Sequence, residues 1–226
     1  MIQIAIDGPG GAGKSTVAKA VAKKLGIVYV DTGALYRTVG LYVSDKGVDP
    51  RDAEGVAALL PDIHIEVRYE NGVQCVYLNG ENPGDRIRTP QMSMYASAVS
   101  AIPAVRAFLL DTQKDIAKKN SVIMDGRDIG TVILPNADLK VFMTASPECR
   151  ARRRYDELVA KGQDVRFEDV LREMNERDHQ DSTREIAPAA AAADAVVLDN
   201  SDMTVDESAD AVIALLEKAC AKGGNR

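Results

Sequence analysis

The sequence predicts an α/β protein in which one parallel sheet of five strands is flanked by helices on both faces. Two observations predict this class. Short apolar segments of strand length alternate with longer segments of helical periodicity, and the first strand runs directly into a glycine-rich turn. With 226 residues, 46% of them hydrophobic, the chain can form one α/β domain with room for a small insert and a lid. We therefore expect a single domain over residues 1–226.

The five predicted strands are short and apolar, as expected for strands that are buried on both faces of a parallel sheet. The first ends before Gly8, and the others cover residues 27–30, 121–124, 139–144 and 195–198. Capping residues mark several helices between them. A helix after the glycine-rich turn ends at Gly26, another opens at Ser146, and the last opens with Thr204 and Glu207 as a capping box. A further helix is predicted over residues 36–43.

The glycine-rich turn has the spacing of a phosphate-binding P-loop. Glycines can take positive φ, so the backbone can turn several N–H groups toward one anion, and the following helix adds its positive N-terminal end. Lys14 then reaches the outer phosphates, and Ser15 offers its hydroxyl to Mg²⁺. A glycine-rich turn with a coincidental lysine is the alternative. We assign the binding of a nucleoside triphosphate, ATP, to Gly8, Pro9, Gly10, Gly11, Ala12, Gly13, Lys14, Ser15 and Thr16.

Residues 62–88 show a different pattern, in which apolar and polar side chains alternate on both sides of Asn71-Gly72. Asn-Gly favours the type I′ turn of a two-residue β-hairpin. We therefore predict an antiparallel hairpin inserted into the α/β alternation, with an edge extension of the main sheet as the alternative.

Charge and composition exclude several classes of protein. A formal net charge of −6 argues against a general binder of nucleic acid or of anionic membranes. Three widely separated cysteines without metal-ligand spacing fit a reducing compartment. No leader and no run of about 18 apolar residues is evident. We expect a cytoplasmic monomer that binds neither nucleic acid nor membrane.

Arginines are concentrated in residues 147–187. Arg150, Arg152, Arg153 and Arg154 lie on one predicted helix, and a second helix from about residue 167 carries Arg177, Asp181 and Arg184 on one face if it is helical throughout. A solvated face that pairs with Asp156 and Glu157 is the alternative for the four arginines of the first helix, most of all for Arg150 and Arg152. A plain ion pair is the alternative for Arg177 and Asp181.

This cationic segment favours phosphoryl transfer among the functions of P-loop proteins. Transfer to a phosphate acceptor brings two polyanions together, so several cations must offset their repulsion. A switch GTPase would need Asn-Lys-x-Asp, which the sequence lacks, and a motor would normally have a longer chain.

The chain resembles the bacterial cytidylate kinases, which belong to the nucleoside monophosphate kinases, over nearly its whole length. The motifs that carry the resemblance are residues 8–16, 31–37, the hairpin insert, Ala96-Ser97 with Pro103 and Arg106, residues 125–131, and residues 176–178 leading to Asp181, Arg184 and Ala187-Pro188. The resemblance implies a P-loop kinase core, a monophosphate-binding region over residues 32–120 and a lid over residues 147–187. It also implies transfer of the γ-phosphoryl group of ATP to CMP or dCMP with Mg²⁺. The open alternatives are UMP, AMP or a small alcohol as acceptor, or a non-catalytic or switch-like nucleotide-binding module.

The resemblance also implies roles for individual residues. It implies that Arg37, Arg127 and Arg184 hold the acceptor phosphate, that Ser97, Arg106 and Asp128 read the cytosine, and that Arg177 and Asp181 face the sugar. Thr32, which we also expect at the acceptor, stands where the family often has serine. Because a nucleoside monophosphate is mostly a dianion at neutral pH, no general base is required. The residues expected to act in catalysis are Lys14, Arg127, Arg153, Arg154 and Asp125, the last of which assists the metal ion.

Overall fold

The computed structural model describes residues 1–70 and 73–223. The chain divides into two compact units. Unit 1 consists of residues 1–27 and 121–226, and unit 2 consists of residues 28–120.

The main sheet has five parallel strands in the order β2-β5-β1-β6-β7, as the sequence predicts. Its strands are β1 (Gln3–Asp7), β2 (Val28–Asp31), β5 (Val122–Gly126), β6 (Leu139–Thr144) and β7 (Val196–Asp199). β1 is central, and its last residue, Asp7, is in register with Gly126 of β5 and Phe142 of β6. The loops that follow β1, β5 and β6 therefore leave the sheet at one edge, where parallel sheets bind their ligands.

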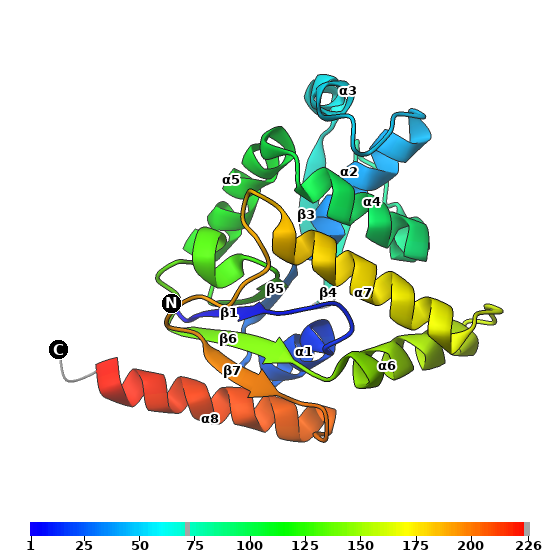
Figure 1. Cartoon of the computed structure of the whole chain (residues 1–226). Helices are drawn as coiled ribbons and strands as arrows, with labels where there is room; N and C mark the ends of the chain where they lie inside the picture. The colour runs from blue at the N-terminus through cyan, green and yellow to red at the C-terminus, as the bar shows by residue number, and fades with distance from the viewer. Residues whose placement is uncertain (71–72, 224–226) are drawn as a thin grey trace. The chain divides into compact units, whose positions relative to one another are not determined.

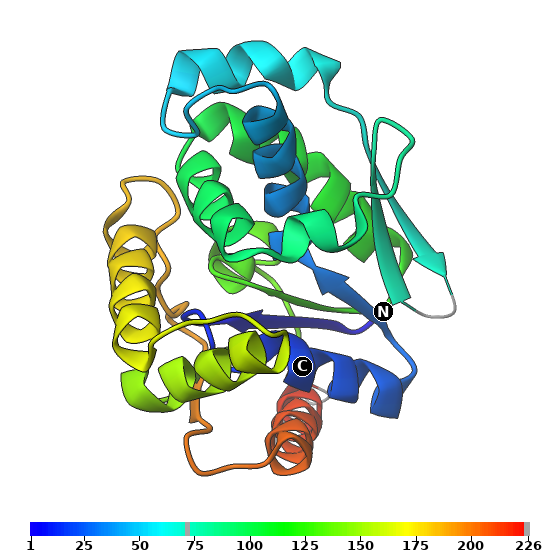
Figure 2. The same cartoon turned by 90° about the vertical axis from the view of Figure 1, so that its right-hand side faces the viewer.

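In unit 1, α1 (Lys14–Leu25) and α8 (Val205–Gly223) pack against each other and against the sheet (Figures 1 and 2). Their predicted caps are confirmed. Gly26 takes a left-handed conformation and donates its N–H to the carbonyl of Ala22. Thr204 and Glu207 form the reciprocal capping box, with Thr204 N–H 2.8 Å from Glu207 Oε2 and Glu207 N–H 3.2 Å from Thr204 Oγ1.

Unit 1 also contains the helical pair α6 (Pro147–Ala160) and α7 (Phe167–Thr183), which pack against each other (Figure 1). A short π-helical turn, η3 (Ile129–Ile133), follows β5. The second arginine helix does not continue to Arg184, so Arg184 does not share a helical face with Arg177 and Asp181. α7 ends at Thr183, and Arg184 has extended backbone angles because its Nε donates to the carbonyl of Ala187 at 2.6 Å and turns the chain.

Unit 2 is mostly helical. It contains α2 (Thr32–Asp45), α3 (Ala53–Leu59), η1 (Leu60–Asp62), η2 (Gly84–Arg88), α4 (Pro90–Ser100) and α5 (Pro103–Lys119). Its core is formed by apolar side chains that include Leu35, Val99 and Leu109. α2 begins four residues before the predicted start, because the Asp31 carboxylate accepts the Ala34 N–H at 2.8 Å and caps the helix earlier.

The predicted hairpin is confirmed as a separate two-stranded sheet in unit 2, formed by β3 (Ile65–Glu70) and β4 (Val73–Leu78). The strands are antiparallel and pair from Ile65 with Leu78 to Glu70 with Val73. Its predicted turn, Asn71-Gly72, lies outside the described residues. Across residues 1–70 and 73–223, no single helix is long and apolar enough to cross a membrane, and only the bent pair α4 and α5 meets that criterion when taken together.

Candidate active site

The P-loop between β1 and α1 has a conformation that requires glycine. Gly8 has φ of 143°, and a Cβ atom there would lie 1.9 Å from the carbonyl oxygen of Met143 in β6. Gly11 and Gly13 take left-handed conformations, with φ of 72° and 83°. Gly13 is the N-cap of α1 and has no side chain to bond the first-turn amides, so these N–H groups are available to an anion.

Lys14 lies over this loop and is 6% exposed. Its ammonium group donates to the carbonyl of Pro9 at 2.7 Å. Burial lowers the pKa of Lys14 to about 7, and the positive charges of Arg127 and Arg177 contribute to the shift. The loop therefore holds a cation whose charge is unfavourable until an anion arrives.

This environment predicts that Lys14 gains a proton when ATP binds. With a pKa lowered to about 7, Lys14 is mostly neutral in the ligand-free protein at pH 8, whereas adjacent phosphates favour the ammonium form. We expect the uptake of on the order of one proton per ATP at pH 8. Calorimetry in buffers of different ionisation enthalpy measures this uptake. The variant Lys14→Ala is the control and should not show it, and a binding enthalpy independent of buffer in the unmodified protein would contradict the prediction.

Ser15 and Asp125 form a pair of hard oxygen ligands next to the P-loop. The Ser15 hydroxyl donates to Asp125 Oδ2 at 2.6 Å, and Asp125 lies at the end of β5 with 5% of its surface exposed. The hydroxyl at the start of α1 and the carboxylate of a neighbouring strand are the groups that hold Mg²⁺ in P-loop proteins.

Arg150 and Asp178 connect the helical pair to the P-loop. Arg150 is 5% exposed and donates to the carbonyls of Ala145 at 3.0 Å and Gly10 at 2.9 Å, and it also pairs with Asp178. Asp178 in turn accepts the Gly10 N–H at 3.2 Å. The solvated-face alternative is therefore wrong for Arg150. It holds for Arg152, which is exposed and lies over the ring of Phe167.

Asn200, which follows β7, makes a second connection between the helical pair and the P-loop. Its buried side chain donates to the carbonyl of Ala12 at 2.9 Å. Arg153 of α6 donates to the backbone carbonyl of Asn200 at 2.8 Å and to its side-chain oxygen at 3.2 Å. Arg154 instead pairs with Glu157 at 2.7 Å. Of the two arginines of α6 that are expected to act in catalysis, Arg153 is thus joined to the P-loop through Asn200, and Arg154 is paired within α6.

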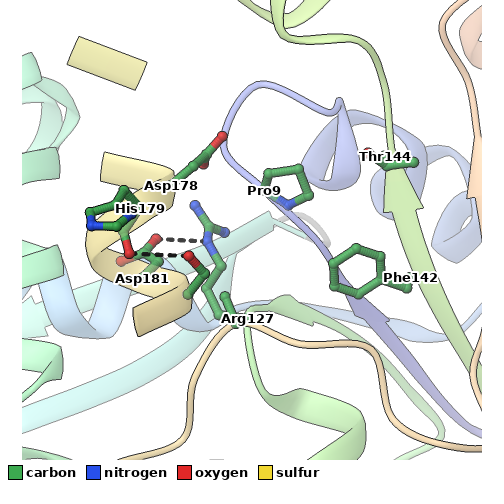
Figure 3. A pocket seen from close by; sticks show the side chains of 9 residues that line it. Pro9, Arg127, Phe142, Thr144, Asp178, His179 and Asp181 are labelled. Carbon is green, nitrogen blue, oxygen red and sulfur yellow. Dashed lines mark hydrogen bonds and ion pairs between the residues drawn. The ribbon is translucent and has the colours of Figure 1, made fainter. Parts of the chain in front are cut away.

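Arg127, which follows β5, points toward α7 (Figure 3). Its Nε donates to Oδ2 of the buried Asp181 at 2.9 Å, and Arg177 lies 3.9 Å from the same oxygen. Asp181 is therefore shared by two arginines, so the plain ion pair of Arg177 and Asp181 is only part of the arrangement. Arg127 and Asp181 line a cavity of about 260 Å³ together with Pro9 and Asp178.

Asp128 lies next to Arg127 and is buried. Arg184, the residue just after α7, places its Nη2 atom 3.8 Å from Asp128 Oδ1. At the end of β1, Asp7 accepts the backbone N–H groups of Ile129 and Gly130, each at 2.7 Å. In unit 1 the predicted residues therefore form three groups: Asp125 with Ser15 of the P-loop, Arg127 and Arg177 with Asp181, and Arg184 with Asp128.

In unit 2, the predicted residues fall into two groups. Thr32 and Arg37 lie on α2, and Arg37 donates to Asp31 Oδ2 at 2.9 Å, while Arg88 lies 3.3 Å from that same oxygen. Ser97 and Arg106 are buried on α4 and α5. The Arg106 guanidinium donates to the carbonyl of Ser100 at 3.3 Å and lies 5.9 Å from the ring centroid of Tyr36.

Sequence reasoning missed the roles of several polar residues that the structure places in these networks. They are Asp7, Asp31, Arg88, Asp178 and Asn200. Three of them, Asp7, Asp31 and Asn200, occur at or just after the end of a strand of the main sheet. This position was the available signal, because ligands and their supporting groups collect at the carboxyl edge of a parallel sheet.

The five-stranded sheet, the glycine loop opening a helix, the Ser15–Asp125 pair and the arginine-bearing helices define a P-loop kinase. Residues 4–218 match the model of the family described as cytidylate kinase. The chain belongs to the cytidylate kinase family.

Curated relatives agree with this family. The cytidylate kinase of Fervidobacterium nodosum is 47% identical over 218 residues, which cover 96% of this chain and 97% of that protein. The cytidylate kinase of Caldicellulosiruptor bescii is 48% identical over 217 residues and 96% of each chain. Among solved structures, an uncharacterized protein from Eubacterium ventriosum has a TM-score of 0.51 at 16% identity, with 96% of this chain and 98% of that chain covered. This last similarity concerns the fold alone.

Proposed function

We propose that the protein transfers the γ-phosphoryl group of ATP to CMP and dCMP, giving CDP and dCDP. The observation that carries this proposal is the membership of residues 4–218 in the cytidylate kinase family. The site network supports it, because a glycine loop with amides available to an anion adjoins several buried or partly buried arginines. Such a combination suits a reaction in which two phosphate-bearing molecules must approach each other.

The donor ATP is assigned to residues 8–16, with its phosphates on the loop amides and Lys14. Ser15 and Asp125 fit Mg²⁺, because both present hard oxygen atoms and they already lie within hydrogen-bond distance of each other. The described residues contain no group of three or more His, Cys, Asp or Glu side chains that would hold a metal. Mg²⁺ is usually bound through one or two carboxylates together with substrate phosphates. When bound, Mg²⁺ neutralises charge on the donor phosphates.

The acceptor is assigned to the residues named below, with region 32–120 as the monophosphate-binding region. Arg37, Arg127 and Arg184 would bind the acceptor phosphate. Each already lies beside a carboxylate, at Asp31, Asp181 and Asp128 respectively. Ser97, Arg106 and Asp128 would read the cytosine, which offers one amine donor and two acceptors to a carboxylate and an arginine. Thr32, Arg177 and Asp181 complete the assignment, the last two at the sugar.

Catalysis in this scheme is alignment and charge neutralisation. The acceptor phosphate attacks as a dianion, so no side chain needs to remove a proton. Lys14, Arg127, Arg153 and Arg154 supply positive charge, and residues 147–187 act as a lid over the donor. We place the enzyme in the cytoplasm as a monomer whose ligands are nucleotides, not nucleic acids or membranes.

A panel of acceptors tests this function. ADP release from ATP and Mg²⁺ is followed by a coupled assay with CMP, dCMP, UMP, AMP and shikimate. One good bidentate contact to a base discriminates by about 1–3 kcal/mol, so kcat/KM for CMP should exceed that for UMP by about 5- to 150-fold. ADP release that is slow and independent of the acceptor would instead indicate a switch-like module. Preference for another acceptor would reassign the substrate within the kinase class.

A further inference from the structure

The helical turn η3 is capped by Asp7, the last residue of β1, and not by its own N-cap residue. Its own N-cap residue is Asp128, and the Asp128 side chain makes no capping hydrogen bond. An aspartate at this position ordinarily accepts an N–H of the first turn. Here Asp7, 121 residues earlier in the sequence, accepts two of them through separate carboxylate oxygens, from Ile129 and Gly130 at 2.7 Å each.

The capping by Asp7 is tightly constrained. Asp7 is 3% exposed and its backbone is in register with Gly126, the last residue of β5. On the other side, a Cβ atom at Gly130 would lie 3.3 Å from Asp7 Oδ2 and 3.1 Å from the Lys140 side chain. The two short hydrogen bonds therefore fix where the chain turns after β5, which is the segment that carries Arg127 and Asp128.

The ionisation of Asp7 depends on its burial, on its two backbone hydrogen bonds and on the nearby charge of Asp128. Burial raises the pKa of Asp7 to about 6, its two backbone hydrogen bonds oppose this shift, and the nearby Asp128 charge adds to it. At neutral pH Asp7 is thus mostly ionised and satisfied by amides. Asp128 is left to face Arg184 at 3.8 Å.

We propose that Asp7 is a positioning residue for the choice of acceptor base, because it caps η3 in place of Asp128 and so fixes the backbone that carries the Asp128 carboxylate. This inference rests on the proposed function, in which Asp128 reads cytosine. Asp7 acts through Asp128 and the η3 backbone and touches neither nucleotide.

The test is the acceptor preference of the variant Asp7→Asn. Asparagine keeps the size and one acceptor oxygen but presents an NH₂ group to a backbone N–H, so one cap is lost and the turn must shift. We expect the ratio of kcat/KM for CMP over UMP to fall at least about fivefold, the equivalent of one hydrogen bond of about 1 kcal/mol. A ratio unchanged from the unmodified protein would overturn the inference.

A double-mutant cycle separates positioning from a general structural effect. Because Asp7 acts through Asp128, the double variant Asp7→Asn, Asp128→Asn should have the same CMP-to-UMP ratio as Asp128→Asn alone. If each substitution lowered the CMP-to-UMP ratio independently, so that the two losses multiplied in the double variant, the inference would be overturned. If Asp7→Asn does not fold, Gly130→Ala crowds the same carboxylate and should shift the ratio in the same direction.

A matched control is available in unit 2. Asp52 caps α3 by accepting the Gly55 N–H at 3.1 Å, and α3 carries no predicted site residue. Asp52→Asn should therefore leave the CMP-to-UMP ratio unchanged, and a shift as large as that of Asp7→Asn would contradict a specific role for Asp7. An unmodified protein without activity on CMP would overturn the proposed function and this inference with it. Normal CMP activity with an unchanged ratio in Asp7→Asn would overturn the inference alone.

Discussion

Replacement of Lys14 by alanine is expected to reduce kcat by at least about 10³-fold, because a preorganised charge on the transferring phosphates is then missing. Lys14 is the only lysine in residues 8–16, and its ammonium group already lies over the loop, 2.7 Å from the Pro9 carbonyl. The neighbouring arginines are held by carboxylates or backbone carbonyls of their own. We therefore expect no other side chain to replace its charge at the outer phosphates of ATP.

The same variant should remain folded. Burial lowers the pKa of Lys14, which means that the folded protein disfavours its charged form relative to the unfolded chain. Removing the ammonium group should leave the melting temperature unchanged or slightly higher. ADP release and thermal denaturation measure the two effects, and Lys23→Ala, at an exposed position of the same helix, is the control with near-normal turnover. Near-normal turnover in purified Lys14→Ala would refute the assignment of Lys14.

Replacement of Arg127 by alanine has the second largest expected effect, which is a fall in kcat/KM for the acceptor CMP. Removing one partner of a buried, hydrogen-bonded charge pair costs about 2–5 kcal/mol, so kcat/KM for CMP should fall by about 30- to 5,000-fold. The loss has two sources. The acceptor phosphate loses an arginine, and Asp181 loses its partner at 2.9 Å while Arg177 lies farther away, at 3.9 Å.

The measurement is kcat/KM for CMP at saturating ATP. Arg127→Lys should recover only part of the activity, because lysine keeps the charge but not the fork of two N–H donors. Arg172→Ala is the matched control, since Arg172 is an exposed arginine of α7 that pairs with Asp169 on the same helix. An Arg127→Ala enzyme with an unchanged kcat/KM for CMP would remove Arg127 from the acceptor site.

The sequence patterns that predicted the fold correctly are local ones. The strand over residues 139–144 was predicted with its observed bounds, and Gly26, Ser146 and Thr204 marked helix ends because capping depends on residues within one turn. The hairpin followed from alternation around an Asn-Gly pair. Each of these signals is contained in a window of fewer than about 20 residues.

The supporting contacts of the site could not be predicted, because they join residues that are distant in sequence. Asp7 bonds to residues 129 and 130, and Asn200 bonds to Ala12. A single sequence does not show which polar side chains form hydrogen bonds with each other across the fold. The same limit explains why the burial of Arg150 could not be predicted. The sequence of a charged helix face is the same whether that face contacts solvent or the P-loop. The predicted helix over residues 36–43 misses the early start of α2, because it does not treat Asp31 as the helix cap.

The carboxylates that face the arginines of unit 1 change what nucleotide binding requires. Arg127 is already neutralised by Asp181, and Arg150 by Asp178. A phosphate that reaches either guanidinium therefore exchanges one anionic partner for another. The binding free energy then reflects only the difference between the two partners, so the enzyme can hold a strongly charged product without retaining it too tightly for release.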